Sequence, residues 1–191
     1  MSGPTMIVVS IVLGVVAHLL FFVVVPKLAA DRGVPARHFE RDLTYTATCT
    51  GTEEAQRAAA ESRPMCLQAY AKFKEQEARS YAFPVLFPYD LVMMTCLAGF
   101  LALAALTAGR YVPWSAGHTY LLILLPLLYW LADFAEDAVL AWLLTHADAV
   151  SAGRVQLLKS LTVAKFFTLA SSYLVVAVLT VLALYGRIRG A

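Results

Sequence analysis

Three acidic residues lie inside an apolar stretch of this sequence, and their type and spacing would allow them to take part in proton transfer or ion pairing. Asp133, Glu136 and Asp137 stand at i, i+3 and i+4, so on a helix they share one face. Further along the chain, one lysine shares a helical face with three hydroxyl side chains: Lys165 with Thr162, Thr168 and Ser172. An ionised group costs about 3 kcal/mol at the centre of a membrane helix, so such groups pair, take up protons or face water. These residues could therefore form a buried ion pair, or act as a general acid or a proton relay.

The acids and the lysine are expected to meet at one depth. If the two apolar helices that carry them turn back near Val150, Glu136 lies fourteen residues before the turn and Lys165 fifteen residues after it. Three acids against one lysine leave an excess of negative charge, so at least one carboxyl should hold a proton or open to a wet cavity. His18 reaches a similar level in the first apolar segment if the chain begins inside. The candidate polar site therefore has five members: His18, Asp133, Glu136, Asp137 and Lys165.

Structural roles compete with these chemical ones. The third apolar segment could end at Ala132, which would leave the acids and Lys165 at the water boundary as an interfacial salt-bridge cluster. A buried contact between acid and lysine could also serve only to lock two helices together. His18 could be a hydrogen-bonded packing residue, and Asp90 could mark a helix start, where an acid suits the positive end of the dipole.

Signals for a cofactor are missing. Haem is not expected, because no second histidine stands clearly at the depth of His18. We find no phosphate-binding loop, no dinucleotide motif, no hydrolase motif and no spacing typical of metal ligands. The sequence therefore leaves the cofactor unknown and predicts no metal.

The composition places these residues in a membrane protein. Of the 191 residues, 60% are hydrophobic and only 15% are charged, against about 25% charged residues in soluble proteins. Residues 26–86 hold 17 of the 28 charged side chains, so the chain has one polar insert between apolar segments. A net charge of +2, diluted along the chain, excludes nucleic acid as an expected partner.

Four apolar segments predict an all-α protein, a single-domain bundle of four transmembrane helices with a helical insert. The expected spans are about 7–25, 90–109, 118–145 and 155–186, with the insert at 26–86. A cleaved signal peptide competes for the first segment. Its length, and the lack of Lys or Arg before it, favour a retained helix. The second segment carries small residues at spacings of three and four, which let helix backbones approach closely in lipid.

Basic residues near the spans indicate the orientation. Arg110, Arg187 and Arg189 outweigh Arg154, so both termini should lie in the cytoplasm and the insert outside. In the insert, Thr52 is a candidate N-cap for a helix over 53–62, and Pro64 can open another helix to about Arg79.

Two of the three cysteines lie in the insert. If the insert faces an oxidising compartment, Cys49 and Cys66 are the natural disulfide pair, worth about 3 kcal/mol in the chain-entropy model. The alternative is two free thiols on a cytoplasmic loop, which requires the opposite orientation. Cys96 is expected to pack as a small apolar residue.

Three short stretches carry a resemblance: Phe87-Pro88-Tyr89-Asp90, Leu131-Ala132-Asp133-Phe134-Ala135-Glu136-Asp137 and Leu158-Lys159-Ser160-Leu161-Thr162-Val163-Ala164-Lys165. Over its C-terminal half, the chain resembles a group of uncharacterised bacterial four-helix membrane proteins. That group has an acidic A-D-x-x-E-N segment in the third helix, where Asp137 here replaces the Asn, and T-x-x-K in the fourth. The resemblance implies a bacterial inner membrane and supplies no activity. The layout is also similar, in architecture only, to the superfamily of sterol isomerases and the sigma-2 receptor.

Two classes of function follow. In the first, the polar site lines a lateral cavity that binds an apolar small molecule or a lipid, with or without acid–base chemistry on it, so enzyme activity is left open. In the second, the protein is an assembly or scaffold subunit whose insert binds a membrane-protein partner outside. Proton-coupled transport ranks third, because four helices would need to dimerise to form a pathway.

Overall fold

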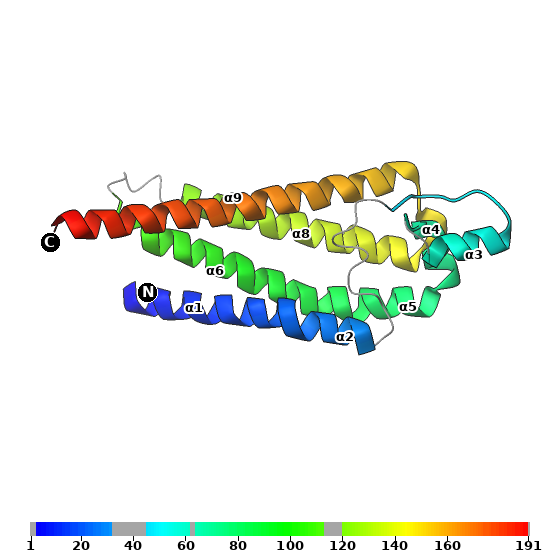
Figure 1. Ribbon diagram of the computed structural model, residues 1–191, viewed down its shortest axis with the longest axis horizontal. Coiled ribbons are helices and arrows are strands. Elements are labelled where there is room, and N and C mark those ends of the chain that lie inside the picture. Colours follow the sequence, from blue (N-terminus) through cyan, green and yellow to red (C-terminus); the bar gives the residue numbers. More distant parts are fainter. Residues whose placement is uncertain (1–2, 32–44, 62–63, 113–119, 191) are drawn as a thin grey trace. The chain divides into compact units, whose positions relative to one another are not determined.

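The computed structural model describes residues 3–31, 45–61, 64–112 and 120–190. These described residues are almost entirely helical, as Figure 1 shows. The β-structure among them is a single isolated bridge between Thr46 and Cys66. The predicted all-α class is therefore confirmed.

The helical elements follow one another with short connections. In chain order they are α1 (Gly3–Leu19), the π-helical turn η1 (Leu20–Val24), α2 (Val25–Asp31), α3 (Glu53–Glu61), α4 (Leu67–Phe73), α5 (Glu75–Ser80), η2 (Tyr81–Asp90), α6 (Leu91–Gly109), α8 (Leu121–Thr145), the 3₁₀ turn η3 (Ala147–Ala149) and α9 (Ala152–Gly190).

Three helical runs are long and apolar enough to cross a membrane. They are Pro4–Leu28, Glu75–Gly109 and Ala152–Gly186. Large aliphatic side chains are exposed along them, as at Ile11 and Leu174, which is consistent with a membrane protein. The predicted fourth span corresponds to α8. It does not meet the same test, because every 18-residue stretch of this helix contains Asp133, Glu136 and Asp137.

The first run extends beyond the predicted end at residue 25. The π-helical turn η1 ends at Val24, two residues before Pro26, and the helix continues as α2 to Asp31. A proline in a helix clashes with the carbonyl four residues earlier, and a π-helical turn relieves such a clash locally. Pro26 therefore does not end this helix.

The segment η2 is broken by two prolines. Phe83 and Phe87 have extended backbone angles, with φ/ψ of −137/117° and −124/118°. Each precedes a proline, Pro84 or Pro88, and a residue before proline avoids the helical region. The chain therefore kinks twice before α6 begins at Leu91.

The insert forms short helices, and a disulfide links the segments that precede α3 and α4. The hydroxyl of Thr52 accepts a hydrogen bond from the Ala55 amide at 3.4 Å, as expected of the N-cap of α3. The predicted second helix is divided into α4 and α5 at Lys74, whose backbone leaves the helical region at φ −119° and ψ 37°. Cys49 and Cys66 are bonded, with their Cα atoms 6.0 Å apart, so the predicted pair is confirmed.

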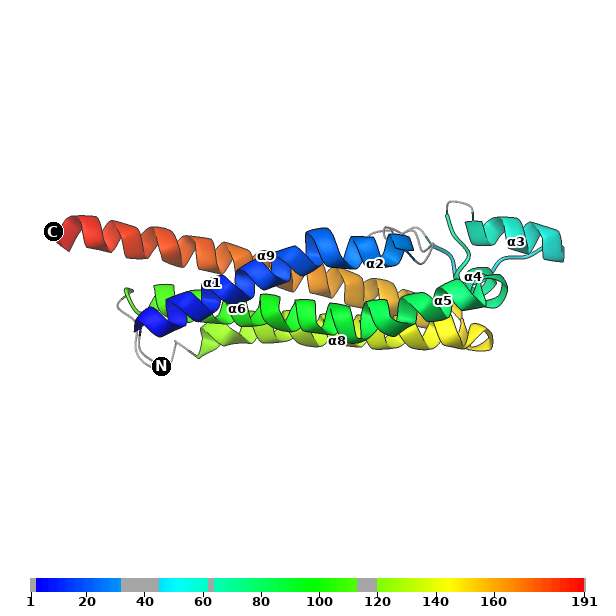
Figure 2. The same cartoon turned by 90° about the horizontal axis from the view of Figure 1, so that it is seen from below.

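The chain divides into two compact units. Unit 1 comprises Met1–Leu20, Val92–Asp133 and Ala164–Ala191, and unit 2 comprises Phe21–Leu91 and Phe134–Val163. Unit 2 holds the larger buried core, in which α3 packs on α4, and aliphatic residues of α8 and α9 meet the insert. Figures 1 and 2 both show α3 beside α4.

In unit 1, α1 packs closely on α6, and Figure 2 shows the two side by side. The hydroxyl of Ser10 donates to the carbonyl of Phe100 at 3.3 Å. One turn later, a Cβ added to Gly14 would lie 3.0 Å from the Phe100 ring, so a larger residue would push the helices apart. On α6, Ala105 is buried, as predicted for a stripe of small residues.

Candidate functional site

The predicted acids and the lysine are buried. Among the side chains that the structure describes, the charged residues that are buried are four carboxyls and one ammonium: Asp90, Asp133, Glu136, Asp137 and Lys165. The carboxyls are at most 1% exposed, and Lys165 is 7% exposed. The helix α8 runs through Ala132 without interruption, and neighbouring protein atoms cover the acids.

In unit 1, Lys165 pairs with Asp133. The ammonium Nζ lies 2.6 Å from Oδ1 of the carboxylate, which is the contact expected from matched depths on two antiparallel helices. Paired charges avoid most of the cost of a lone ion in a medium of low dielectric constant. This contact confirms the predicted pairing of Lys165 with Asp133 or Glu136.

In unit 2, Glu136 contacts the hydroxyl of Thr162. The hydroxyl oxygen lies 2.5 Å from Oε1 of Glu136 and 3.0 Å from the backbone carbonyl of Leu158. Thr162 stands one turn before Lys165 on α9, so both residues of the T-x-x-K pattern meet acids of α8.

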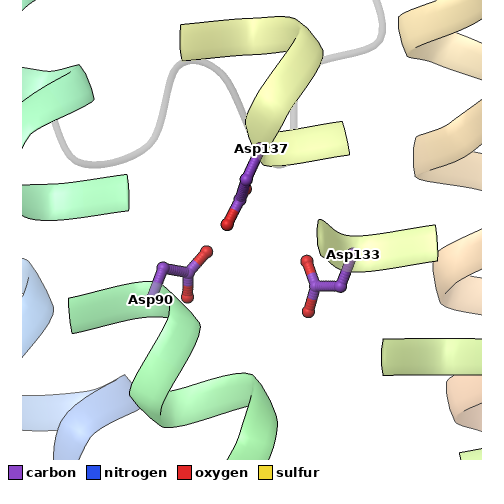
Figure 3. Close-up of side chains that lie close together, drawn as sticks. All are labelled: Asp90, Asp133 and Asp137. Carbon is purple, nitrogen blue, oxygen red and sulfur yellow. The ribbon is translucent and has the colours of Figure 1, made fainter. Parts of the chain in front are cut away.

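A fourth acid, Asp90, joins the buried set from the start of α6. One of its carboxylate oxygens lies within 4.8 Å of an oxygen of Asp137, and Figure 3 shows the two side chains pointing toward one another. Phe87 packs edge-on against Phe134, with ring centroids 6.2 Å apart. Because each ring lies three residues before an acid, this contact brings Asp90 to Asp137.

The sequence interpretation of Asp90 as only a marker of a helix start is too narrow. The residue does precede α6, but it is fully buried. The doubly kinked Phe-Pro-x-x-Phe-Pro segment before it was the available signal. Two prolines there indicate that the backbone bends before the helix begins, and such bends change the direction in which the following side chains point.

His18 differs from the other predicted members of the site. Its side chain is exposed, and Nδ1 lies 2.7 Å from the backbone carbonyl of Gly14 in the same helix. A ring nitrogen at that distance donates its proton to the carbonyl. The structure thus gives His18 the hydrogen bond expected of a packing residue and does not place it among the buried charges.

An apolar groove lies within unit 1 between α1, α6 and α9. It has a volume of about 440 Å³. Its walls are aliphatic and small side chains with four hydroxyl-bearing ones: Ile7, Ser10, Ile11, Ala104, Thr107, Ala108, Tyr111, Thr180, Ala183 and Leu184. A groove of this size and lining suits part of an apolar molecule.

The buried carboxyls can hold protons, accept hydrogen bonds or contact a cation. Carboxylate oxygens suit hard cations such as Mg²⁺ or Ca²⁺, and Asp90 and Asp137 lie close enough to offer them. One negative charge is already balanced, because Asp133 pairs with Lys165. Comparisons of the chain with protein-family models, curated proteins and solved structures gave no match.

Proposed function

We propose that this membrane protein binds an apolar small molecule or a lipid, whose polar group is held by the buried acids and Lys165. The observation that carries the proposal is the burial of charged groups. Among the described side chains, four carboxyls and one ammonium are buried, which is costly in a protein interior and is typical of a functional site.

The contacts of Glu136 support a role in holding a proton. The Thr162 hydroxyl has one hydrogen, yet its oxygen lies within hydrogen-bond distance of both Glu136 and the Leu158 carbonyl. Both contacts are satisfied at once when Glu136 is protonated and donates to Thr162, which then donates to Leu158. Such a carboxyl can give a proton to a bound molecule or take one from it.

The groove of unit 1 supports the apolar part of the proposal. The three helices that line the groove belong to the three runs that could cross a membrane. In a membrane, lipid acyl chains would therefore surround the groove. We assign a lipid acyl chain to it. The enlarged side chain of Ala108→Leu should fill the groove and lower the amount of lipid retained.

The proposal is tested by mass spectrometry of an unbiased lipid extract of the purified protein. The wild type is compared with Glu136→Gln and Lys165→Met, which remove the acid or the cation with little change in volume. Asp148→Asn serves as a matched control, since Asp148 is an exposed acid in the turn between α8 and α9.

A compound enriched with the wild type and with Asp148→Asn, and lost from both folded site variants, is expected. Folding is verified by circular dichroism and size-exclusion chromatography. If no compound is enriched with the wild type, the ligand-binding proposal fails. The alternative function, an assembly or scaffold subunit that uses the insert to bind a partner, would then be preferred.

The proposed location is a bacterial inner membrane, with α8 as the fourth span and both termini in the cytoplasm. The resemblance to bacterial four-helix proteins and the placement of Arg110, Arg187 and Arg189 support it. A membrane-impermeant thiol reagent applied to intact cells provides the test. After reduction, Cys49 and Cys66 should be labelled from outside, and a cysteine introduced at Ala191 should not.

A further inference from the structure

Three of the four hydroxyl groups that line the groove of unit 1 are bonded to helix backbone. Thr107 and Thr180 each donate to the carbonyl four residues earlier, at 2.7 Å in both cases. Ser10 donates to the Phe100 carbonyl of the neighbouring helix at 3.3 Å. A polar head group would therefore find few hydrogen-bond partners inside the groove, whereas a hydrocarbon chain needs none.

A positive charge lies next to one end of the groove. Ala108 and Tyr111 both line the groove, and Arg110 stands between them in the chain, directly after the end of α6. Nη2 of Arg110 donates to Sδ of Met6 at 2.9 Å, and Met6 precedes Ile7, another lining residue. Arg110 itself is exposed, so its guanidinium is accessible to a molecule that enters the groove from this end.

The charges of unit 1 are mostly positive. Its segments contain one acidic residue, Asp133, which pairs with Lys165. The other Lys and Arg residues of these segments are Arg110, Arg187 and Arg189, and the last two stand in the final turn of α9. None of the ion pairs among the described residues includes Arg110. This distribution of charge favours a ligand with a net negative head group over a zwitterionic one.

The position of Arg110 suits a lipid phosphate. The residue directly follows Glu75–Gly109, one of the runs that could cross a membrane, and so is expected at the membrane boundary, where phosphates lie. A guanidinium can donate two parallel hydrogen bonds to a phosphate. From Tyr111 back to Ala104, the lining residues of α6 cover seven positions, or about 10 Å along the helix axis. An acyl chain beside the phosphate can follow the groove over that length.

We propose that the groove holds one acyl chain of an anionic phospholipid, whose phosphate binds Arg110. This inference rests on the proposed function for the acyl chain in the groove, and it adds the class of lipid that supplies the chain. On α9, Lys165 stands nineteen residues before the lining residue Leu184, or about 28 Å along the helix axis. The phospholipid is therefore a second molecule, separate from the ligand whose polar group Lys165 and the buried acids hold.

The test measures lipid binding to the delipidated protein in detergent by native mass spectrometry. Phosphatidylglycerol and phosphatidylcholine with the same acyl chains are added in equal amounts, so that only the head group differs. Arg110→Gln removes the charge, Arg110→Lys keeps it, and Ala108→Leu narrows the groove. Arg154→Gln is the matched control, because Arg154 is an exposed arginine in the first turn of α9 that does not line the groove.

Phosphatidylglycerol should bind the wild type and Arg154→Gln about tenfold more tightly than phosphatidylcholine, as expected for charge-assisted hydrogen bonds to an anionic head group. Arg110→Gln should lose this preference, and Arg110→Lys should keep part of it. Ala108→Leu should weaken the binding of both lipids, because it fills the space of the acyl chain. Circular dichroism and size-exclusion chromatography verify the folding of each variant.

Equal binding of the two lipids to the wild type would overturn the inference without the use of any variant. So would an undiminished preference in Arg110→Gln, an equal loss in Arg154→Gln, or unchanged binding of both lipids to Ala108→Leu.

The proposed function is tested separately, since Glu136→Gln should leave the binding of phosphatidylglycerol unchanged. If the lipid extract contains a compound that depends on Glu136 and Lys165 while the preference for phosphatidylglycerol does not depend on Arg110, only this inference is wrong. If the preference depends on Arg110 and the extract contains no such compound, only the site of the buried acids and Lys165 fails.

Discussion

Lys165 of α9 forms an ion pair with Asp133 of α8, with 2.6 Å between Nζ and Oδ1 and both side chains buried. Removing one partner strands the other charge in the protein interior. Lys165→Met or Asp133→Asn alone should therefore destabilise the protein by about 3–5 kcal/mol, and the double variant by less than the sum. Unfolding in mixed detergent micelles measures the cycle. Additive losses would show that the two groups do not interact.

The contacts of Glu136 predict a protonated carboxyl at neutral pH. The infrared spectrum of the purified protein should contain the C=O band of a protonated carboxyl, and Glu136→Gln should remove it. In Thr162→Val the band should shift, because Glu136 loses its contact with the Thr162 hydroxyl. A spectrum in which Glu136→Gln removes only carboxylate bands would contradict this assignment.

The disulfide between Cys49 and Cys66 should stabilise the insert. Its loop, with a sequence separation of 17, restricts the unfolded chain by about 3 kcal/mol. Cys49→Ser should lower the stability by a similar amount, and reduction of the wild type should reproduce the loss. In a Cys96→Ala background, which leaves only this pair, no thiol should react with alkylating reagent before reduction. Two reactive thiols in freshly isolated membranes would disprove the bond.

Two buried tyrosines of the insert predict a loss of stability in alkali. Burial is the main cause that raises the pKa of Tyr45 and Tyr70, with Glu136 and Glu77 respectively adding to it. Above about pH 10 the unfolded chain releases phenol protons that the folded chain keeps, so rising pH favours unfolding. At neutral pH both states hold these protons, and no effect is expected.

Ultraviolet absorbance of tyrosinate measures this titration during denaturation. The double variant Tyr45→Phe/Tyr70→Phe should lose less stability between neutral and alkaline pH than the wild type. Tyr120→Phe is the control, since this residue is exposed. A wild type and double variant with the same dependence on alkaline pH would show that neither phenol is protected by folding.

Much of the secondary structure and the main ion pair could be predicted from local patterns. The apolar run before Arg110 ends at Gly109, where α6 ends, and the acids and Lys165 meet because helical spacing and an equal distance from a turn are properties of the sequence. The continuation of the first helix through Pro26 could not be predicted. It depends on a π-helical turn, which has no clear pattern of residues.

The sequence by itself determined an apolar helical protein, a polar insert with Cys49 and Cys66 as the candidate disulfide pair, and acids on one face of a helix with a lysine at a matching depth on the next. These features follow from residue type and from the period of the helix, which are local. Only the tertiary structure decided that Asp90 lies close to Asp137, that His18 is exposed, and that Tyr45 of the insert shares a buried core with Leu140 and Leu158. The reason is that contacts between distant segments depend on kinks and side-chain packing, here the bends at Phe83 and Phe87 and the core around Tyr45.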